Sequence, residues 1–354
     1  MSRCILTCLL VLACIEAKAA DHCVILQYHH FSDDTPAITS VTLEQFDNHL
    51  AYLKDNGFNI LPLREVVNAL KHGNPLPDRC VGLTVDDAYV SVYTNAFPRL
   101  RKLRWPLTVF VNTEAVDEGI AAYMSWDQMR ELSKQGVVFE NHGHGHIHMI
   151  RKHLNESEAE WRRRIIADIS VAQQRITDEI GVAPMLFAHP YGEYNPDLIS
   201  IIGKLGLTGF GQQSGPAWPG ADFGALPRFP MAARFAAMKS FKTKVNTLPM
   251  PLVSAEPADP LVPLNQRRPS LTLRLIPGSY VQAAVQCFIG GSNIVDLEWP
   301  ERIDDTLIVT PAFDLSPGRH LTNCTMPSAQ KGRFYWYSHN WFVRKADGGW
   351  YSEY

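Results

Sequence analysis

Short apolar runs alternate with longer amphipathic segments through residues 24–245. The runs have the length of buried strands. The segments between them carry glycine stops and polar caps that are typical of helices, such as Thr42 with Gln45 and Ser125 with Gln128. The expected strands are residues 24–30, 81–85, 107–111, 137–140, 185–188 and 207–210, and the expected helices are residues 43–56, 95–104, 125–136, 156–180 and 196–205. This repeated alternation of strand and helix predicts a parallel α/β sheet or barrel.

The pattern changes after about residue 245. Five prolines between Leu248 and Pro269 are spaced as in a stiff linker. Beyond them the apolar positions alternate in short runs without helical period, and Gly and Pro separate the runs. The runs are SLTLRLI, YVQAAVQCFI, NIVDLEW, TLIVTPAF, GRFYWYS and NWFVRK. They predict a small antiparallel β-sandwich.

Residues 1–19 have the features of an export signal, with an apolar stretch over 5–15 and a small-residue cleavage site at Ala17-Lys18-Ala19. A lipoprotein signal ending at Cys14 is an alternative, although Leu12 stands where such signals usually carry a small residue. The mature chain is therefore expected to be secreted or periplasmic. No other apolar stretch reaches the ~20 residues that a membrane-spanning helix needs.

Apolar residues make up 46 % of the 354 residues and charged residues 19 %, so a sizeable core can form. The net charge of −3 and the lack of a long basic run argue against a nucleic-acid binder. Loss of residues 1–19 leaves Cys23, Cys80, Cys287 and Cys324, an even number that suggests disulfides. If the strands after Cys23 and Cys80 are neighbours, those two cysteines meet and the other two pair; buried free thiols are the alternative.

Four polar clusters directly follow apolar runs in the expected α/β region. They are Tyr28-His29-His30, Asp86-Asp87, the run His142 to His148, and His189-Pro190-Tyr191-Gly192. In parallel α/β folds, ligands bind at the C-terminal ends of the strands. The sequence therefore predicts a functional site at that edge.

The spacing of the histidines points to metal chemistry. A separation of four residues brings His142 and His146 to one side of a turn, and imidazole nitrogens suit a borderline-soft divalent ion. Adjacent residues that leave a strand point to opposite sides, so one of Asp86 and Asp87 can bind the ion while the other accepts a proton. For the histidines the alternative is a non-catalytic metal tract. For the two aspartates it is a helix N-cap with a solvated neighbour.

Three motifs resemble those of polysaccharide deacetylases of the NodB-homology type, carbohydrate esterase family four. Thr84-Val85-Asp86-Asp87-Ala88 is similar to T-F-D-D-G, Asn141 to His146 is similar to N-H-[ST]-x-x-H, and Phe187 to Gly192 is similar to R-P-P-Y-G. The resemblance covers roughly residues 22–235. It implies a distorted, incomplete (β/α) barrel as a deacetylase domain. The expected domains are then the signal over 1–19, the deacetylase domain over 20–245, the linker over 246–268 and the β-sandwich over 269–354.

The resemblance also implies site residues in a hydrolase of amide bonds. Asp86 would be the catalytic base. Asp87, His142 and His146 would bind Zn²⁺ or another divalent metal, and the backbone N–H of Tyr191 would help to hold the oxyanion.

Some positions depart from the family pattern. Gly143 replaces the Ser or Thr that orients the metal site, and Ala188 stands where many members carry an arginine that braces the base. Arg228 is a candidate substitute for that arginine. His189 is a candidate for the lining of the pocket.

The usual late Leu-x-His motif is absent near residue 230, but residues 24–29 have the same strand-then-histidine form. This arrangement resembles the circularly rearranged branch that includes biofilm poly-N-acetylglucosamine deacetylases. That resemblance implies that His29 is the general acid. His30 is the less suitable candidate because its side chain is expected on the opposite face.

These expectations describe an exported deacetylase of N-acetylglucosamine-containing polysaccharides. A zinc-activated water would attack the amide, Asp86 would take the proton of that water, and His29 would protonate the leaving amine. An O-acetyl polysaccharide esterase, a non-catalytic carbohydrate-binding protein and a metal-storage protein stay open as alternatives. Neither the linkage of the substrate nor the oligomeric state follows from the sequence.

The aromatic run near the C-terminus has two faces. Phe334 and Trp336 should lie on one side of a strand, and Tyr335 and Tyr337 on the other. One pair must fill the core of the β-sandwich. The other pair would form a platform for sugar rings, unless both pairs are structural.

Overall fold

The computed structural model describes residues 19–290, 294–301 and 305–352. The export signal predicted over 1–19 lies outside these residues except for Ala19, which begins β1 (Ala19–Ala20) beside β6 (Leu76–Pro77). Among the described helices, none is long and apolar enough to cross a membrane.

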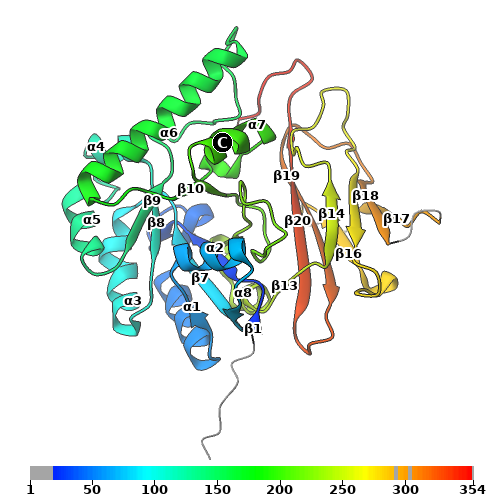
Figure 1. Ribbon diagram of the computed structural model, residues 1–354, viewed down its shortest axis with the longest axis horizontal. Helices are drawn as coiled ribbons and strands as arrows, with labels where there is room; N and C mark the ends of the chain where they lie inside the picture. Colours follow the sequence, from blue (N-terminus) through cyan, green and yellow to red (C-terminus); the bar gives the residue numbers. More distant parts are fainter. Residues whose placement is uncertain (1–18, 291–293, 302–304, 353–354) are drawn as a thin grey trace, which may run out of the picture.

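A parallel sheet forms one half of the molecule, on the left in Figure 1. Its strands run in the spatial order β11, β10, β9, β8, β7, β2 and β12, with β5 paired to β7. These strands are β2 (Val24–Tyr28), β5 (Asn59–Ile60), β7 (Cys80–Val85), β8 (Thr108–Val111), β9 (Val138–Asn141), β10 (Leu186–Ala188), β11 (Thr208–Phe210) and β12 (Phe229–Pro230). Phe210, the last residue of β11, forms an isolated parallel bridge with Leu226, three residues before β12. The predicted incomplete barrel is therefore confirmed.

Helices surround this sheet (Figure 1). They are α1 (Leu43–Asp55), α2 (Leu63–His72), α3 (Phe97–Leu103), α4 (Thr113–Asp117), α5 (Trp126–Ser133), α6 (Glu158–Ile180), α7 (Pro196–Lys204) and α8 (Met238–Val245). Capping boxes at Thr42 and Ser125 begin α1 and α5 as the sequence predicts. The helices α2, α4 and α8 were not expected from the sequence, and each begins without a side-chain cap.

Two four-stranded sheets follow, on the right in Figure 1. One has the order β13-β20-β19-β16 and the other β14-β15-β18-β17, with antiparallel pairing except between β13 and β20. The strands are β13 (Leu248–Pro249), β14 (Leu252–Glu256), β15 (Leu271–Leu275), β16 (Gln286–Ile289), β17 (Val295–Glu298), β18 (Thr306–Pro311), β19 (Gly318–Pro327) and β20 (Phe334–Val343). Side chains from both sheets share one apolar core, as predicted for a β-sandwich.

Two details differ from the expectation. Residues 246–268 were expected to be a linker, but they contain β13 and β14, which pair with β20 and β15. The prolines fit because both strands lie at sheet edges, where a missing N–H is tolerated. The runs GRFYWYS and NWFVRK form one strand, β20, because the polar residues 338–340 at their junction are buried instead of forming a turn. The division into separate domains stays a prediction.

The two faces of β20 contact different parts of the molecule. Tyr335 and Tyr337 pack against the core of the β-sandwich. Trp336 packs against the barrel core, with its ring centroid 5.5 Å from that of Phe229. The predicted alternation of faces is confirmed, and β20 joins the sandwich to the barrel.

Both predicted cysteine pairs are disulfides. Cys23–Cys80 joins the beginnings of β2 and β7, and Cys287–Cys324 joins β16 and β19. The first bond fixes two neighbouring barrel strands whose C-terminal ends carry predicted site residues.

Replacing Cys23 and Cys80 together by alanine should lower the free energy of unfolding by about 4 kcal/mol, because the crosslink constrains an unfolded loop of 57 residues. Urea unfolding of the double variant and the parent measures this difference. Equal urea midpoints would contradict a stabilising role for this bond.

Candidate active site

The structure brings the predicted polar clusters to one edge of the parallel sheet. His29 directly follows β2, Asp86 and Asp87 follow β7, and His142 follows β9. Parallel strands end at the same edge, so residues distant in sequence face a common space.

Three side chains could hold a metal ion. Asp87 Oδ1 lies 3.4 Å from Nε2 of His142 and 3.3 Å from Nε2 of His146. The three ligand atoms all lie within 4.8 Å of one another. Ligand atoms placed tetrahedrally at about 2.0–2.2 Å from zinc would be roughly 3.3–3.6 Å apart. The two shorter separations match that geometry.

The electrostatics of this cluster fit a cation. Nδ1 of His142 donates to the carbonyl oxygen of Ala188 at 2.8 Å, so Nε2, the ring nitrogen that faces Asp87, is the one available as a metal ligand. Oδ1 of Asp87 is buried and accepts no hydrogen bond within the described chain. Burial raises the pKa of Asp87, but the two histidines outweigh this effect and hold the pKa below its usual value. A cation would therefore satisfy Oδ1 of this ionised carboxylate.

The loop that carries the histidines is clamped from α6. The carboxylate of Asp168 accepts hydrogen bonds from the backbone N–H groups of His144 and Gly145 at 2.9 and 3.0 Å. Gly143 has a φ of +77°, and a Cβ at this position would lie 2.8 Å from Asp168 Oδ1. This contact explains why glycine stands where the family pattern has Ser or Thr. The His144 ring hydrogen-bonds with Thr113.

Three residues of the predicted site have left-handed backbone conformations. The φ values are +70° at Asp87, +46° at His146 and +57° at Tyr191. Such conformations cost on the order of 1–3 kcal/mol per residue and collect at functional sites. The surrounding hydrogen bonds and packing must hold these residues in place.

Asp86 is fully buried and bound by two side chains. Arg228, also fully buried, donates from Nη1 to Oδ1 at 2.6 Å and from Nη2 to Oδ2 at 2.8 Å. Gln27 donates to Oδ2 at 2.6 Å. Burial raises the pKa of Asp86, but the charge of Arg228 outweighs it and keeps the pKa below its usual value. Arg228 thus holds the carboxylate as expected, whereas Gln27, two residues before His29, was missed.

The two adjacent histidines have different surroundings. His29 follows Tyr28, whose carbonyl accepts a hydrogen bond from the backbone N–H of Asp86 at 2.9 Å, so the two residues leave neighbouring strands side by side. The His30 ring stacks on Tyr89 with centroids 3.6 Å apart. Burial lowers the pKa of His30, and Asp87 opposes that effect.

In the segment after β10, Tyr191 lies beside the metal cluster as expected, whereas His189 differs from the prediction. The Tyr191 ring lies 4.6 Å from that of His146 and stacks on His148 at 3.8 Å. His189 does not line the pocket, because it is fully buried and its Nε2 donates to the carbonyl of Gly224 at 2.8 Å. His189 therefore supports the loop of residues 211–228 through this buried hydrogen bond.

Two further contacts come from the C-terminal region and were missed. Arg319 on β19 donates to the carbonyl oxygen of Tyr191. Tyr351 donates to the buried carboxylate of Glu193, which also accepts from His148 and Arg151 at 2.9 and 2.6 Å. Burial raises the pKa of Glu193, but these partners hold it below its usual value. No local sequence pattern marks contacts across more than a hundred residues.

Comparison with known proteins shows which family the barrel region resembles. Residues 73–210 match the family model for polysaccharide deacetylase. This part of the barrel is therefore similar to a polysaccharide deacetylase domain. This confirms the resemblance carried by the three motifs.

Individual proteins are also similar in sequence to this chain. An Escherichia coli (strain K12) protein named poly-beta-1,6-N-acetyl-D-glucosamine N-deacetylase is 25 % identical over 262 residues, covering 64 % of this chain but only 38 % of that protein. A protein of the same name from Staphylococcus aureus (strain MRSA252) is 28 % identical over 194 residues, covering 53 % of this chain and 67 % of that protein.

A solved structure confirms the fold of the deacetylase domain. The Streptococcus pyogenes deacetylase PplD, in complex with acetate, superposes with a TM-score of 0.57 at 24 % identity. The match covers 63 % of this chain and 98 % of that one.

Changing His142 or His146 to alanine should reduce bound metal from about one ion per chain to a small fraction, because each change removes one of three ligands. Elemental mass analysis after dialysis against zinc measures this loss. His144→Ala is the matched control and should retain the metal, since the His144 ring is engaged with Thr113. Unchanged zinc in His142→Ala would refute the ligand assignment.

Proposed function

We propose that this protein is an exported, metal-dependent deacetylase that hydrolyses N-acetyl groups of N-acetylglucosamine-containing polysaccharides. The observation that carries the proposal is the Asp87–His142–His146 cluster beside the buried Asp86–Arg228 pair. The printed names of the Escherichia coli and Staphylococcus aureus relatives support the substrate class. Two disulfides support an oxidising, extracytoplasmic location.

Asp87, His142 and His146 would hold the metal. When bound, a divalent ion such as Zn²⁺ supplies Lewis acidity that polarises a carbonyl and makes water more acidic. The remaining roles belong to side chains and backbone groups around the cluster.

Asp86 is assigned as the general base. Arg228 and Gln27 fix both carboxylate oxygens, so the carboxylate is oriented before substrate binds. Asp86 takes a proton from the water whose oxygen attacks the acetyl carbon. The bond between this carbon and nitrogen then breaks and gives acetate and an amine.

His29 is assigned as the general acid that protonates the leaving nitrogen. In support, His29 directly follows β2, and β2 pairs with β7, the strand that leads into Asp86 and Asp87. The backbone N–H of Tyr191 is assigned to the oxyanion, and the left-handed conformation of Tyr191 supports a specialised backbone role. His29 thereby acts on the nitrogen of the scissile amide and the Tyr191 N–H on its oxygen, while Asp86 acts on the water.

Acetate release by the zinc-loaded protein tests the proposal. The substrates are β-1,6-linked N-acetylglucosamine oligomers, chitin oligomers and acetylxylan. We expect acetate from the β-1,6-linked oligomers. Release from acetylxylan alone would make the protein an O-acetyl esterase, and bound zinc without acetate from any substrate would indicate a binding or storage protein.

Asp86→Asn should abolish acetate release while zinc stays bound, because the change removes a base and not a ligand. His29→Ala should lower kcat by roughly 10²–10⁴-fold, the usual contribution of a general acid. His30→Ala is the matched control and should lower kcat much less, since its ring is engaged with Tyr89. Loss of zinc from Asp86→Asn, or a larger effect at His30, would reverse the assignments.

Arg319→Ala should lower kcat by about tenfold on short and long oligomers alike, because misplacing a positioned group costs rate even when the change is remote. Arg319 is a positioning residue, since it holds the carbonyl of Tyr191 and the side chain of Gln212. Arg268→Ala, on the same β-sandwich but bound to Pro311, is the control and should keep full activity. A defect confined to long oligomers would instead place Arg319 in polymer binding.

A further inference from the structure

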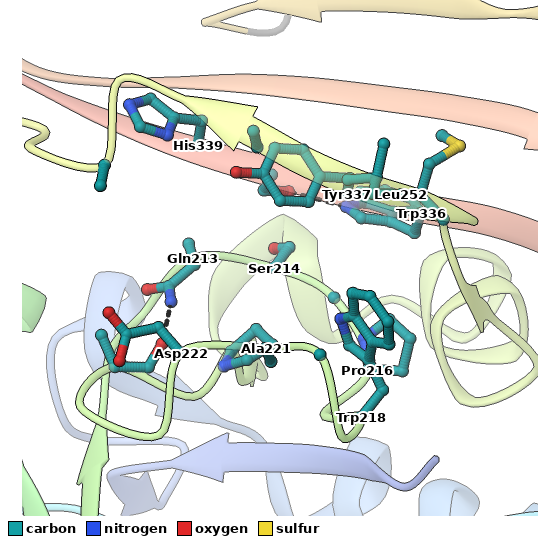
Figure 2. Close-up of a pocket in the computed structure, with 18 of the residues that line it drawn as sticks. Gln213, Ser214, Pro216, Trp218, Ala221, Asp222, Leu252, Trp336, Tyr337 and His339 are labelled. Atoms are coloured by element: carbon teal, nitrogen blue, oxygen red, sulfur yellow. Dashed lines mark hydrogen bonds between the residues drawn. The ribbon is translucent and has the colours of Figure 1, made fainter. Parts of the chain in front are cut away.

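A cavity of about 220 Å³ lies between the loop of residues 211–228 and the sheet strands β14 and β20 (Figure 2). Its walls include Gln213, Ser214 and Trp218 from the loop, and Trp336, Tyr337 and His339 from β20. None of the residues assigned above to metal binding or catalysis lines it. At liquid density its volume holds roughly seven water molecules, which is room for one ring-sized ligand.

The cavity wall is continuous with the proposed active site. The loop leaves β11 and ends at Arg228, which binds Asp86. The backbone N–H of Arg228 donates to the carbonyl of Gln213 at 3.0 Å. One segment therefore forms a cavity wall and carries the residue that orients the proposed base.

One end of the cavity is aromatic. Figure 2 shows the Trp218 ring rising from the loop toward Trp336 and Leu252 on the opposite wall. The Trp336 indole is fixed by a hydrogen bond to the Ser338 hydroxyl at 2.8 Å and by its contact with Phe229. Gly220 packs against Trp218, since a Cβ there would lie 2.3 Å from the ring. These contacts hold two aromatic rings in defined positions.

The remainder of the lining is polar. Within the described part of the chain, the hydroxyls of Ser214 and Tyr337 form no hydrogen bond, although both residues line the cavity. Burial raises the pKa of Tyr337, so this hydroxyl stays protonated and can donate. Burial also lowers the pKa of His339 to about 4, so its ring is neutral at physiological pH.

The charge of the lining limits the ligand. Asp222 is the one ionised side chain among the lining residues, and it is exposed at the rim. An anion would meet no positive partner there. A lining of indole rings and neutral hydrogen-bonding groups instead suits an uncharged molecule with apolar and hydroxyl-bearing faces.

We propose that this cavity binds one uncharged acetamido-pyranose unit of the polysaccharide. One sugar face would pack on Trp218 and Trp336, and its hydroxyls would pair with Ser214 and Tyr337. The identity of the polymer rests on the proposed function, whereas the ring-sized, uncharged ligand follows from the cavity itself. The cavity would thus anchor a sugar unit separate from the one that is deacetylated.

The test uses the full-length protein and the methyl β-glycoside of N-acetylglucosamine as the probe. The readout is the indole N–H resonance of Trp218 in a nitrogen-15 NMR spectrum, assigned by its absence in Trp218→Phe. We expect a saturable shift of the Trp218 and Trp336 resonances. The Trp126 indole, bound to Asp117 at 2.7 Å, is the internal control and should not shift.

Gly220→Ala should raise the apparent Kd of the probe by about tenfold, because the new methyl group displaces the Trp218 ring and removes its stacking contact with the sugar. Phe313→Ala removes an exposed aromatic outside the cavity and should leave the Kd unchanged. An unshifted Trp218 resonance, an equal Kd in Gly220→Ala, or tighter binding of the cationic glucosamine glycoside would overturn the proposal.

The result is independent of turnover. If the protein releases no acetate from any substrate but the Trp218 resonance shifts, the proposed function fails and the cavity assignment stands. If acetate is released and the resonance does not shift, the cavity assignment alone fails. With β-1,6-linked polymer as substrate, Gly220→Ala should raise KM by about tenfold, consistent with one lost stacking contact; an equal KM would contradict use of the cavity by the polymer.

Discussion

The buried ion pair of Asp86 and Arg228 connects parts of the barrel that the parallel sheet leaves apart. Asp86 follows the interior strand β7, whereas Arg228 precedes the outer strand β12 and also donates to the carbonyl of Gly211 beyond β11. An unpaired charge at this depth would cost several kcal/mol, so each partner requires the other. Arg228 thus spans the barrel opening through its bond to Gly211 and fixes the direction of the Asp86 carboxylate with two hydrogen bonds.

Residues outside the recognisable motifs hold the site in its strained form. Asp87 and His146 have left-handed backbones, which local preference opposes. Asp168 counteracts this by binding two consecutive N–H groups of the histidine loop from α6. Because Asp168 occupies the space of a side chain at Gly143, the clamp and the glycine depend on each other. The departure from the family motif is therefore a change in how the loop is supported.

Features that depend on local sequence pattern or on residue type could be predicted from the sequence. The alternation of strands and helices, the caps at Thr42 and Ser125, and both cysteine pairings are confirmed. Prediction from the sequence failed where a distant contact decides the structure. Polar residues 338–340 suggested a break, yet they are buried and β20 continues through them. The bond from Tyr351 to Glu193 spans 158 residues and has no local signature.

The incomplete barrel explains why the β-sandwich lies against the deacetylase domain. Between β11 and β12 the chain makes the excursion 211–228 instead of continuing the sheet, and Ala217 within it pairs with Cys23. One face of β20 packs on the sandwich core, so Trp336 on its other face can contact the barrel residue Phe229. Together with the hydrogen bond from Arg319 to Tyr191, this packing makes the second region a wall of the first. The opening that weakens the barrel as a closed sheet is thus what allows C-terminal side chains to reach the loops of the proposed active site.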